Sequence, residues 1–139
     1  MCAVQIDLER ECSASAQKLW DVLLKPPLWW GEGVTLDPVP GGIFYEPWQD
    51  ASGLHHTHGR VTAIDPPQLL VLSWWDDGWP FTTEVTLQVK STGDHSRISL
   101  THKGWEAAPK DQQRGLVDAH SKGWSFHLGN LVTCAGQGR

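Results

Sequence analysis

The sequence predicts an α+β domain in which one antiparallel sheet is covered by a long C-terminal helix. Apolar and polar residues alternate from Val34 to about Lys103, helical spacing replaces this alternation after Lys110, and only short elements precede the sheet. The 139 residues correspond to about one ordinary domain, and no repeat or linker divides them. We therefore expect a single domain over residues 1–139.

The N-terminal part is expected to hold one strand and short helices. Val4, Ile6 and Leu8 alternate with polar residues, as in a half-buried strand. The segment 13–27 indicates a short helix, because two serines can cap its start and a Pro-Pro pair ends it. Leu-Trp-Trp at 28–30 precedes two glycines and predicts a single turn that leans on the domain.

Six strands in meander order are predicted next. Residues 34–48 indicate two strands around Pro-Gly-Gly, residues 55–75 two around Asp-Pro-Pro, and residues 81–105 two joined by Ser-Thr-Gly-Asp. With the first strand they make a seven-stranded antiparallel sheet. The segment from Lys110 to about Cys134 contains no proline and has apolar residues at helical spacing, so we expect one helix across the concave face of a curved sheet.

The composition excludes several classes of function. The net charge is −5 and the eleven Lys and Arg residues are scattered, so nucleic acid is not an expected partner. No apolar run is long enough to span a bilayer, and no membrane partner is expected. The three cysteines lack C-x-x-C spacing and no signal peptide precedes them, which favours a soluble, reduced, cytoplasmic protein. Because nucleotide, hydrolase and zinc motifs are absent, no cofactor is predicted.

Tryptophan is unusually frequent. The chain has nine tryptophans but only three phenylalanines and one tyrosine. Because tryptophan is rarely buried completely and is common where an apolar ring edge meets a polar group or a ligand, we expect part of this excess at a surface or a cavity wall.

Six stretches in a characteristic order and spacing carry a family resemblance. They are "SASAQKLWDVLLKPPLWWGEG", "PGGIFYEP", "GRVTAIDPPQLLVLSWW", "TTEVTLQV", "LTHKG" and "HSKGWSFHLGNL". Over about residues 5–131 the chain resembles the SRPBCC or START-like superfamily, in particular the branch of activator of heat-shock protein 90 ATPase homologue-like proteins. The resemblance implies a helix-grip fold, with the sheet wrapped around the C-terminal helix and a deep apolar pocket between them. The superfamily hosts carriers, cyclases, hydrolases and co-chaperones, so it does not by itself fix the function.

The resemblance also implies which side chains face the pocket. They are Phe44, Leu70, Leu72, Trp74, Val85, Leu87, Ile98, Leu100 and His102 in the sheet, and Trp124, Leu128 and Leu131 in the last helix. All of these except Ile98 and Leu131 are predicted to bind the ligand, together with His120, which shares the helical stripe of Trp124. A pocket with aromatic walls suits a planar or polycyclic ligand through stacking. Trp75 and Trp79 are expected to cover an edge or a loop instead.

Three residues are candidates for acid–base chemistry. His102 follows the inward alternation of its strand, and His120 lies one turn before Trp124, so both could reach one end of the pocket. The alternative is that each ring is hydrogen-bonded and only shapes the cavity. Glu46 alternates with Phe44 and would have a raised pKa if buried, unless the neighbouring proline shifts the register of the strand.

Histidines and a glycine elsewhere have simpler interpretations. His56 and His58 share one face of a strand and His55 the other, but we expect the pair on the outer side without further ligands, so no metal site is predicted. Gly123 costs a helix about 1 kcal/mol relative to alanine. We expect it where the backbone approaches the sheet closely or leaves room beside a ring.

Three functions remain open from the sequence. The first is binding of a small hydrophobic, aromatic or polyketide-like molecule, as in a carrier, a sequestering protein or a self-resistance protein. The second is an acid–base enzyme of the cyclase or dehydratase kind in the same pocket. The third is an interaction module of the chaperone-activator kind, which the lack of the additional domain of eukaryotic activators disfavours. We expect a monomer or a homodimer.

Overall fold

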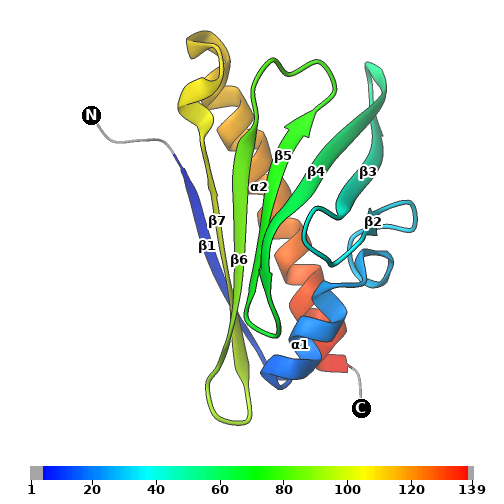
Figure 1. Cartoon of the computed structure of the whole chain (residues 1–139), viewed down its shortest axis with the longest axis vertical. Helices are drawn as coiled ribbons and strands as arrows, with labels where there is room; N and C mark the ends of the chain where they lie inside the picture. The colour runs from blue at the N-terminus through cyan, green and yellow to red at the C-terminus, as the bar shows by residue number, and fades with distance from the viewer. Residues whose placement is uncertain (1–4, 138–139) are drawn as a thin grey trace.

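The computed structural model describes residues 5–137 and has the predicted order of elements (Figure 1). The strands are β1 (Ile6–Cys12), β2 (Thr35–Leu36), β3 (Ile43–Asp50), β4 (Gly53–Asp65), β5 (Leu69–Asp76), β6 (Thr83–Ser91) and β7 (Ser96–Lys103). The helices are α1 (Ala16–Leu23) and α2 (Lys110–Gln137), with short 3-10 turns η1 (Pro26–Leu28) and η2 (Trp105–Ala107). Val4, expected in the first strand, lies outside the described residues.

All seven strands join in one antiparallel sheet, and its order confirms the predicted meander. The order is β1-β7-β6-β5-β4-β3-β2, so each strand from β2 to β7 pairs with the next and β1 closes the far edge beside β7. The pairing of β4 with β5 shifts register between Val61 and Ala63, a bulge that bends a strand. Helix α2 passes behind the sheet along its length (Figure 1), which is the helix-grip arrangement.

The first helix begins where the sequence predicts. The Ser15 hydroxyl accepts a hydrogen bond from the backbone N–H of Lys18 at 3.1 Å and caps α1. The turn predicted over 28–30 forms two residues earlier, because the fixed φ of proline suits the first position of a helical turn. Trp30 therefore lies after the turn, and its side chain reaches into the interior.

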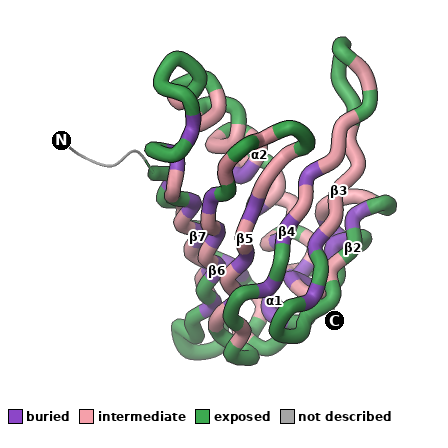
Figure 2. The backbone as a smooth tube through the Cα atoms, turned by 45° about the horizontal axis from the view of Figure 1, so that its top comes forward, coloured by how far each residue is buried: buried purple, intermediate pink, exposed green. Residues whose placement is uncertain are grey.

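The core lies between the inner face of the sheet, α1 and α2. Buried residues alternate with more exposed ones along the strands (Figure 2), as the sequence predicts. The side chains predicted to face inward are all buried, with exposed fractions of at most 3%; they are Phe44, Leu70, Leu72, Trp74, Val85, Leu87, Ile98, Leu100, His102, Trp124, Leu128 and Leu131. The facing of the strands and of α2 is thus confirmed.

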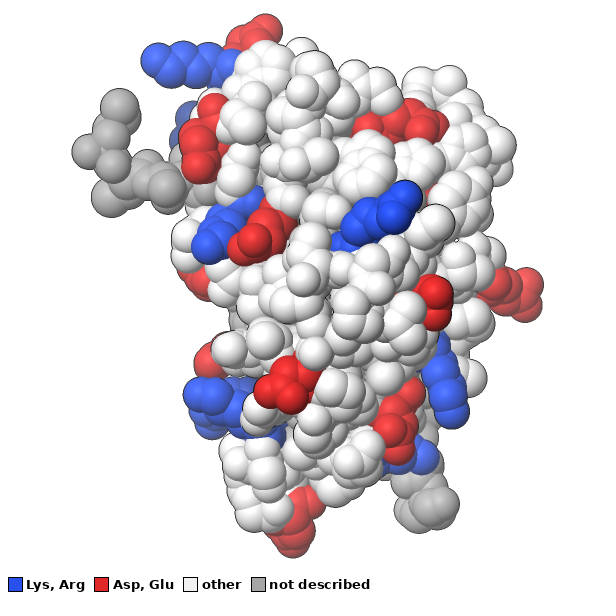
Figure 3. Space-filling view, viewed as in Figure 1, with Lys and Arg blue, Asp and Glu red and all other residues white. Residues whose placement is uncertain are grey.

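Charges are mixed on the face of the molecule seen in Figure 3. Acidic and basic side chains are interspersed there, and much of the surface carries neither charge. Within residues 5–137, no helix combines the length and the apolar character needed to cross a membrane.

Candidate ligand-binding cavity

A cavity of about 370 Å³ separates one end of the sheet from α2. We call it the inner cavity. Its lining residues come from the turn after η1, from β3, β4 and β5, and from α2; they are Trp30, Glu46, Trp48, Thr57, Trp74, Asp76, Leu116, Ala119, His120, Gly123, Trp124 and His127. A cavity therefore exists where the helix-grip fold implies one, and four indole rings form much of its wall.

The alternation of side chains along the strands explains which residues of the sheet line the cavity. Glu46 and Trp48 are two residues apart on β3, and Trp74 and Asp76 are two residues apart on β5, so each pair shares the inner face. Thr57 on β4 stands in register with Glu46 on one side and Asp76 on the other. The three polar side chains thus form one row across three strands.

One stripe of α2 forms the opposite wall. Its residues recur every three or four positions, the spacing that keeps side chains on one face of a helix; they are Leu116, Ala119, His120, Gly123, Trp124 and His127. A Cβ atom built on Gly123 would meet no atom within 4 Å. Of the two explanations expected for Gly123, the structure thus favours room beside the rings of the cavity wall over a close approach of the backbone to the sheet.

Trp30 is the central member of the aromatic cluster. Its ring lies 5.1 Å from Trp124, 5.0 Å from Phe44 and 4.7 Å from His127, measured between centroids. The indole Nε1 donates a hydrogen bond to Glu46 Oε2 at 3.1 Å. Trp30 thus connects the sheet wall of the cavity to the helix wall.

Each of the four indole N–H groups in the lining already has a protein acceptor. Trp30 donates to Glu46, Trp48 to Thr57 Oγ1 at 2.9 Å, Trp74 to His120 Nε2 at 3.3 Å and Trp124 to His102 Nδ1 at 3.0 Å. Thr57 in turn donates to Asp76 Oδ1 at 2.6 Å. The indole donors are therefore used inside the protein, and free acceptor atoms remain.

Burial shifts the protonation of the lining side chains. Desolvation raises the pKa of Glu46 to about 7, with a further increase from the negative charge of Asp76 and an opposing hydrogen bond from Trp30. Burial lowers the pKa of His127 to about 4. Burial also lowers the pKa of His120, although the hydrogen bond to the Leu116 carbonyl and the negative charge of Asp76 each raise it. Both histidines are therefore neutral at pH 7, and Glu46 is poised between its two forms.

The two histidines of the lining differ in free hydrogen-bonding capacity. His120 Nε2 accepts from Trp74 and its Nδ1 donates to the Leu116 carbonyl at 2.9 Å, so both nitrogens are used. His127 Nδ1 is buried without a partner, and it is the only such side-chain nitrogen or oxygen in the part of the chain that the structure describes. This nitrogen exposes almost no surface, so the His127 ring lines the inner cavity with other atoms than Nδ1.

His102 is fully buried and does not line the inner cavity. Its Nδ1 accepts from Trp124, so its Nε2 carries the proton and donates to Thr83 Oγ1 at 2.7 Å, while Thr83 donates to the Trp74 carbonyl. Burial lowers the pKa of His102 to about 2. The expectation that His102 reaches the pocket is not met, because indole rings surround it and neither nitrogen is free; its hydrogen bonds hold Trp124 in place.

The residues that the sequence assigns to ligand binding divide into two groups. Trp74, His120 and Trp124 line the inner cavity. The others lie in the packed core, where side chains of sheet and helix meet and fill the space; they are Phe44, Leu70, Leu72, Val85, Leu87, Leu100, His102 and Leu128. Of the catalytic candidates, Glu46 and His120 line the cavity.

Seven lining residues were missed by the sequence analysis. They are Trp30, Trp48, Thr57, Asp76, Leu116, Ala119 and His127. Trp48 and Asp76 continue the alternation of Glu46 and Trp74 by one step, and His127 continues the helical stripe of His120, so these patterns could have found them. No local pattern identifies Trp30, which depends on the path of the chain after η1.

The histidines of β4 lie where the sequence predicts. His56 Nδ1 and His58 Nε2 each bond to one oxygen of Asp77 at 2.7 Å, which confirms that they share a face. His55 lies on the other side and bonds to Asp50 at 2.9 Å. No group of three or more His, Cys, Asp or Glu residues among residues 5–137 is arranged to hold a metal ion.

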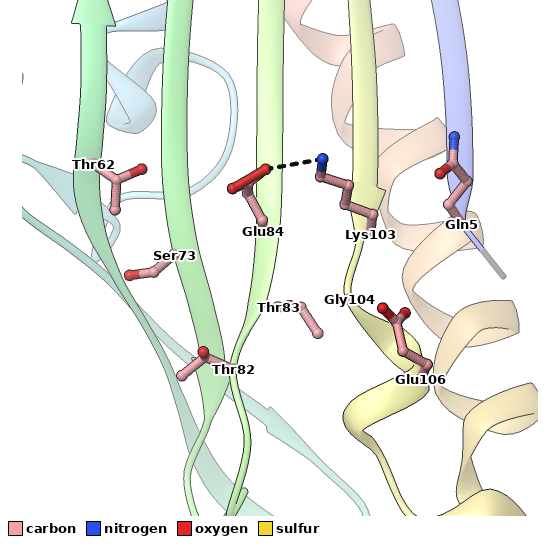
Figure 4. Close-up of a pocket in the computed structure, with 9 residues that line it drawn as sticks. All are labelled: Gln5, Thr62, Ser73, Thr82, Thr83, Glu84, Lys103, Gly104 and Glu106. Atoms are coloured by element: carbon pink, nitrogen blue, oxygen red, sulfur yellow. Dashed lines mark ion pairs between the residues drawn. The ribbon is translucent and has the colours of Figure 1, made fainter. Parts of the chain in front are cut away.

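A second hollow of about 420 Å³ lies on the outer face of the sheet (Figure 4). Its lining is mostly polar and includes Thr62, Ser73 and the ion pair of Lys103 with Glu84 at 3.5 Å. Both side chains of this pair are about half exposed, and no aromatic residue lines the hollow. The inner cavity is therefore the better candidate for a binding site.

Comparisons with solved structures show the same fold in other organisms. CalU16 from Micromonospora echinospora is 21% identical with a TM-score of 0.72, over 97% of this chain and 78% of that chain. The Aha1 dimer of Colwellia psychrerythraea is 18% identical with a TM-score of 0.75, over 98% of both chains. An HSP90 activator from Plasmodium falciparum is 23% identical with a TM-score of 0.74, over 95% of this chain and 96% of that chain.

The family assignment rests on the sequence itself. No curated protein matches the chain. The model of one family, described as "Activator of Hsp90 ATPase homolog 1-like protein", matches residues 13–136, which run from before α1 to the penultimate residue of α2. The resemblance seen in the sequence is thereby confirmed, and the chain belongs to the family of activator of Hsp90 ATPase homolog 1-like proteins.

Proposed function

We propose that this protein binds a small, mainly apolar, aromatic molecule in the inner cavity. The observation that supports the proposal is the wall of four indole rings around a volume of about 370 Å³. Ligand pockets typically have volumes of about 300–1,000 Å³, are mostly apolar and have a few polar groups at fixed positions. The row of Glu46, Thr57 and Asp76 supplies such polar groups at one wall.

A substitution that fills the cavity tests this proposal. The leucine side chain of Gly123→Leu would extend from the cavity stripe of α2 into space that no atom occupies. We expect this variant to bind 1-naphthalenemethanol about tenfold more weakly or worse, because the ring and the leucine compete for the same volume. Quenching of tryptophan fluorescence during titration measures the affinity, and native mass spectrometry of freshly purified wild type detects any co-purified small molecule.

Gly115→Leu is the matched control for that experiment. Gly115 also lies on α2 and also has no atom within 4 Å of a built Cβ, but it is exposed and does not line the cavity. Each substitution removes a helical glycine, so intrinsic helix propensity rises in both. Equal affinity of the two variants for the probe would contradict binding in the inner cavity.

Acid–base catalysis in the same cavity is the second candidate function. The observation that favours it is the pKa of Glu46 of about 7, since a group titrating near the working pH can both donate and accept a proton. Such an enzyme would act on a carbonyl compound, as cyclases and dehydratases do. It predicts that Glu46→Gln abolishes turnover while an uncharged ligand still binds.

A chaperone-activator function is the third candidate. The names of the Colwellia and Plasmodium proteins are the basis for a chaperone-activator function, and at these identities the likeness shows only the fold. Stimulation of a chaperone ATPase by this protein would be the corresponding test. A cytoplasmic location and a monomeric or homodimeric state remain predictions.

A further inference from the structure

We propose that the inner cavity selects a ligand in which an amine or ammonium cation is attached to an aromatic or apolar body. The proposal rests on the proposed binding function and adds the chemical class of the ligand. The geometry behind it combines two inward carboxylates, a set of free acceptor atoms and a wall of indole rings in one cavity.

The charges in the lining have one sign. Glu46 and Asp76 both face the inner cavity, on strands that flank β4, with Thr57 between them in register. Their Cα atoms are two strand spacings apart, about 10 Å, so a single cationic group can lie between the two carboxyl groups. Among the lining residues that the structure describes there is no Lys or Arg to neutralise them. A partly buried negative site of this kind attracts a cation.

When Glu46 is ionised, the free hydrogen-bonding atoms of the carboxyl groups in the cavity are acceptors. Glu46 uses Oε2 for Trp30 and Asp76 uses Oδ1 for Thr57, which leaves the second oxygen of each carboxyl group for a ligand. Since the four indole donors are already used, a ligand that supplies N–H donors complements the cavity better than one that supplies acceptors.

The aromatic wall favours the same class of ligand. Indole is the ring that attracts cations most strongly over its face, and recognition of alkylated ammonium groups by several aromatic rings depends on this attraction. Trp30, Trp48, Trp74 and Trp124 also provide apolar surface for the rest of the molecule. A neutral aromatic ligand would use this surface but would leave the carboxylates unpaired.

Binding of a cation should be coupled to ionisation of Glu46. The groups that face Glu46 are Asp76 on β5, Trp30, and the neutral His120 and His127 on α2. A cation favours the ionised carboxylate, which is the main form above pH 7 and is lost as the pH falls through about 7. The affinity for a cation should therefore fall by about tenfold between pH 8 and pH 6.

Three probes with the same ring system test the inference. They are 1-naphthylmethylammonium, 1-naphthalenemethanol and 1-naphthoate, which carry a positive charge, no charge and a negative charge. We expect the cation to bind wild type at pH 8 about tenfold more tightly than the alcohol, with the carboxylate weakest. Glu46→Gln should remove most of this preference, so that the ratio of the two affinities approaches one. Glu84→Gln, which changes a carboxylate on the outer face, is the matched control and should keep the preference.

The outcomes separate this inference from the proposed function. Binding of the alcohol or the carboxylate as tightly as the cation would overturn the selection of a cation and leave aromatic binding intact. Loss of the preference in Glu84→Gln as well as in Glu46→Gln would also overturn it, because the effect would then arise from the overall charge of the protein. Binding of none of the three probes up to millimolar concentrations would count against the proposed function itself.

Discussion

Replacement of Trp124 by alanine should lower the free energy of unfolding by about 4 kcal/mol. Trp124 is 2% exposed and packs against Trp30 and Trp74 at centroid distances of 5.1 and 5.2 Å. The substitution also removes the indole donor to Nδ1 of the buried His102, and an unpaired buried nitrogen adds to the cost of the cavity. Urea unfolding followed by circular dichroism gives the change directly from the shift of the midpoint.

A control two residues along the same helix separates core packing from helix propensity. Phe126 is 66% exposed, so Phe126→Ala should change the free energy of unfolding by at most about 0.5 kcal/mol. Trp124→Phe keeps a large ring and loses the indole N–H, and its effect should fall between the two. A loss of similar size for Trp124→Ala and Phe126→Ala would mean that the ring cluster does not support the fold as described.

The fold could be predicted from the sequence because its determinants are local and repeat along the chain. The alternation of Leu70, Leu72 and Trp74 identifies a strand and its inner face without knowledge of its neighbours. The turns contain glycine and proline at the positions that end strands. Short turns between successive strands then leave a meander as the simplest antiparallel sheet, which is the order found.

The candidate site was predicted less completely, because a cavity depends on where packing is missing. Leu87 and Trp74 face inward by the same rule, yet Leu87 is in the filled core and Trp74 lines the cavity. The difference depends on the distance between α2 and each part of the sheet. The alternation of apolar residues along a strand carries no information about this distance. Gly123 was the one local signal for open space, and its meaning became clear only with its surroundings.

The polar part of the site shows a second reason why the site was predicted less completely than the fold. Burial of Glu46 and its pKa of about 7 depend on Trp30, Asp76 and α2 together, and these lie far apart in the sequence. Likewise, the unpaired nitrogen of His127 can be recognised only when all possible partners are placed. Sequence patterns could suggest these residues as candidates but could not show which acceptors stay free.

A fall in pH from 6.5 to 5 should reduce the free energy of unfolding by about 1.5 kcal/mol or more. Burial lowers the pKa to about 2 for His102 and to about 4 for His127, so both stay neutral in the folded protein over this range. It shifts the pKa of His120 in the same direction, which adds to the loss. In the unfolded chain each histidine takes up a proton near the ordinary pKa of 6.5. The stability they confer is thus present above pH 6.5 and is lost as the pH falls toward the folded values.

Glu46 acts in the opposite direction over part of the same range. Its pKa is raised from 4.5 to about 7, so the stability that it confers is present below pH 4.5 and is lost as the pH rises through 7. Between these values it offsets about one histidine. For His102, His127 and Glu46 together, the net number of protons taken up on unfolding then rises to about one at pH 5, and one proton is worth about 1.4 kcal/mol per pH unit.

Two variants should change the acid sensitivity in opposite directions. His127→Gln removes one buried neutral histidine, so the free energy of unfolding should fall less steeply with decreasing pH. Glu46→Gln removes the offset and should make the fall steeper. His95→Gln, at a histidine whose side chain is 59% exposed, is the control and should leave the slope unchanged. Urea titrations at half-unit steps of pH measure the slopes. Since overall destabilisation shifts the whole curve without altering its slope, equal slopes in all four proteins would show that these buried groups do not determine the acid sensitivity.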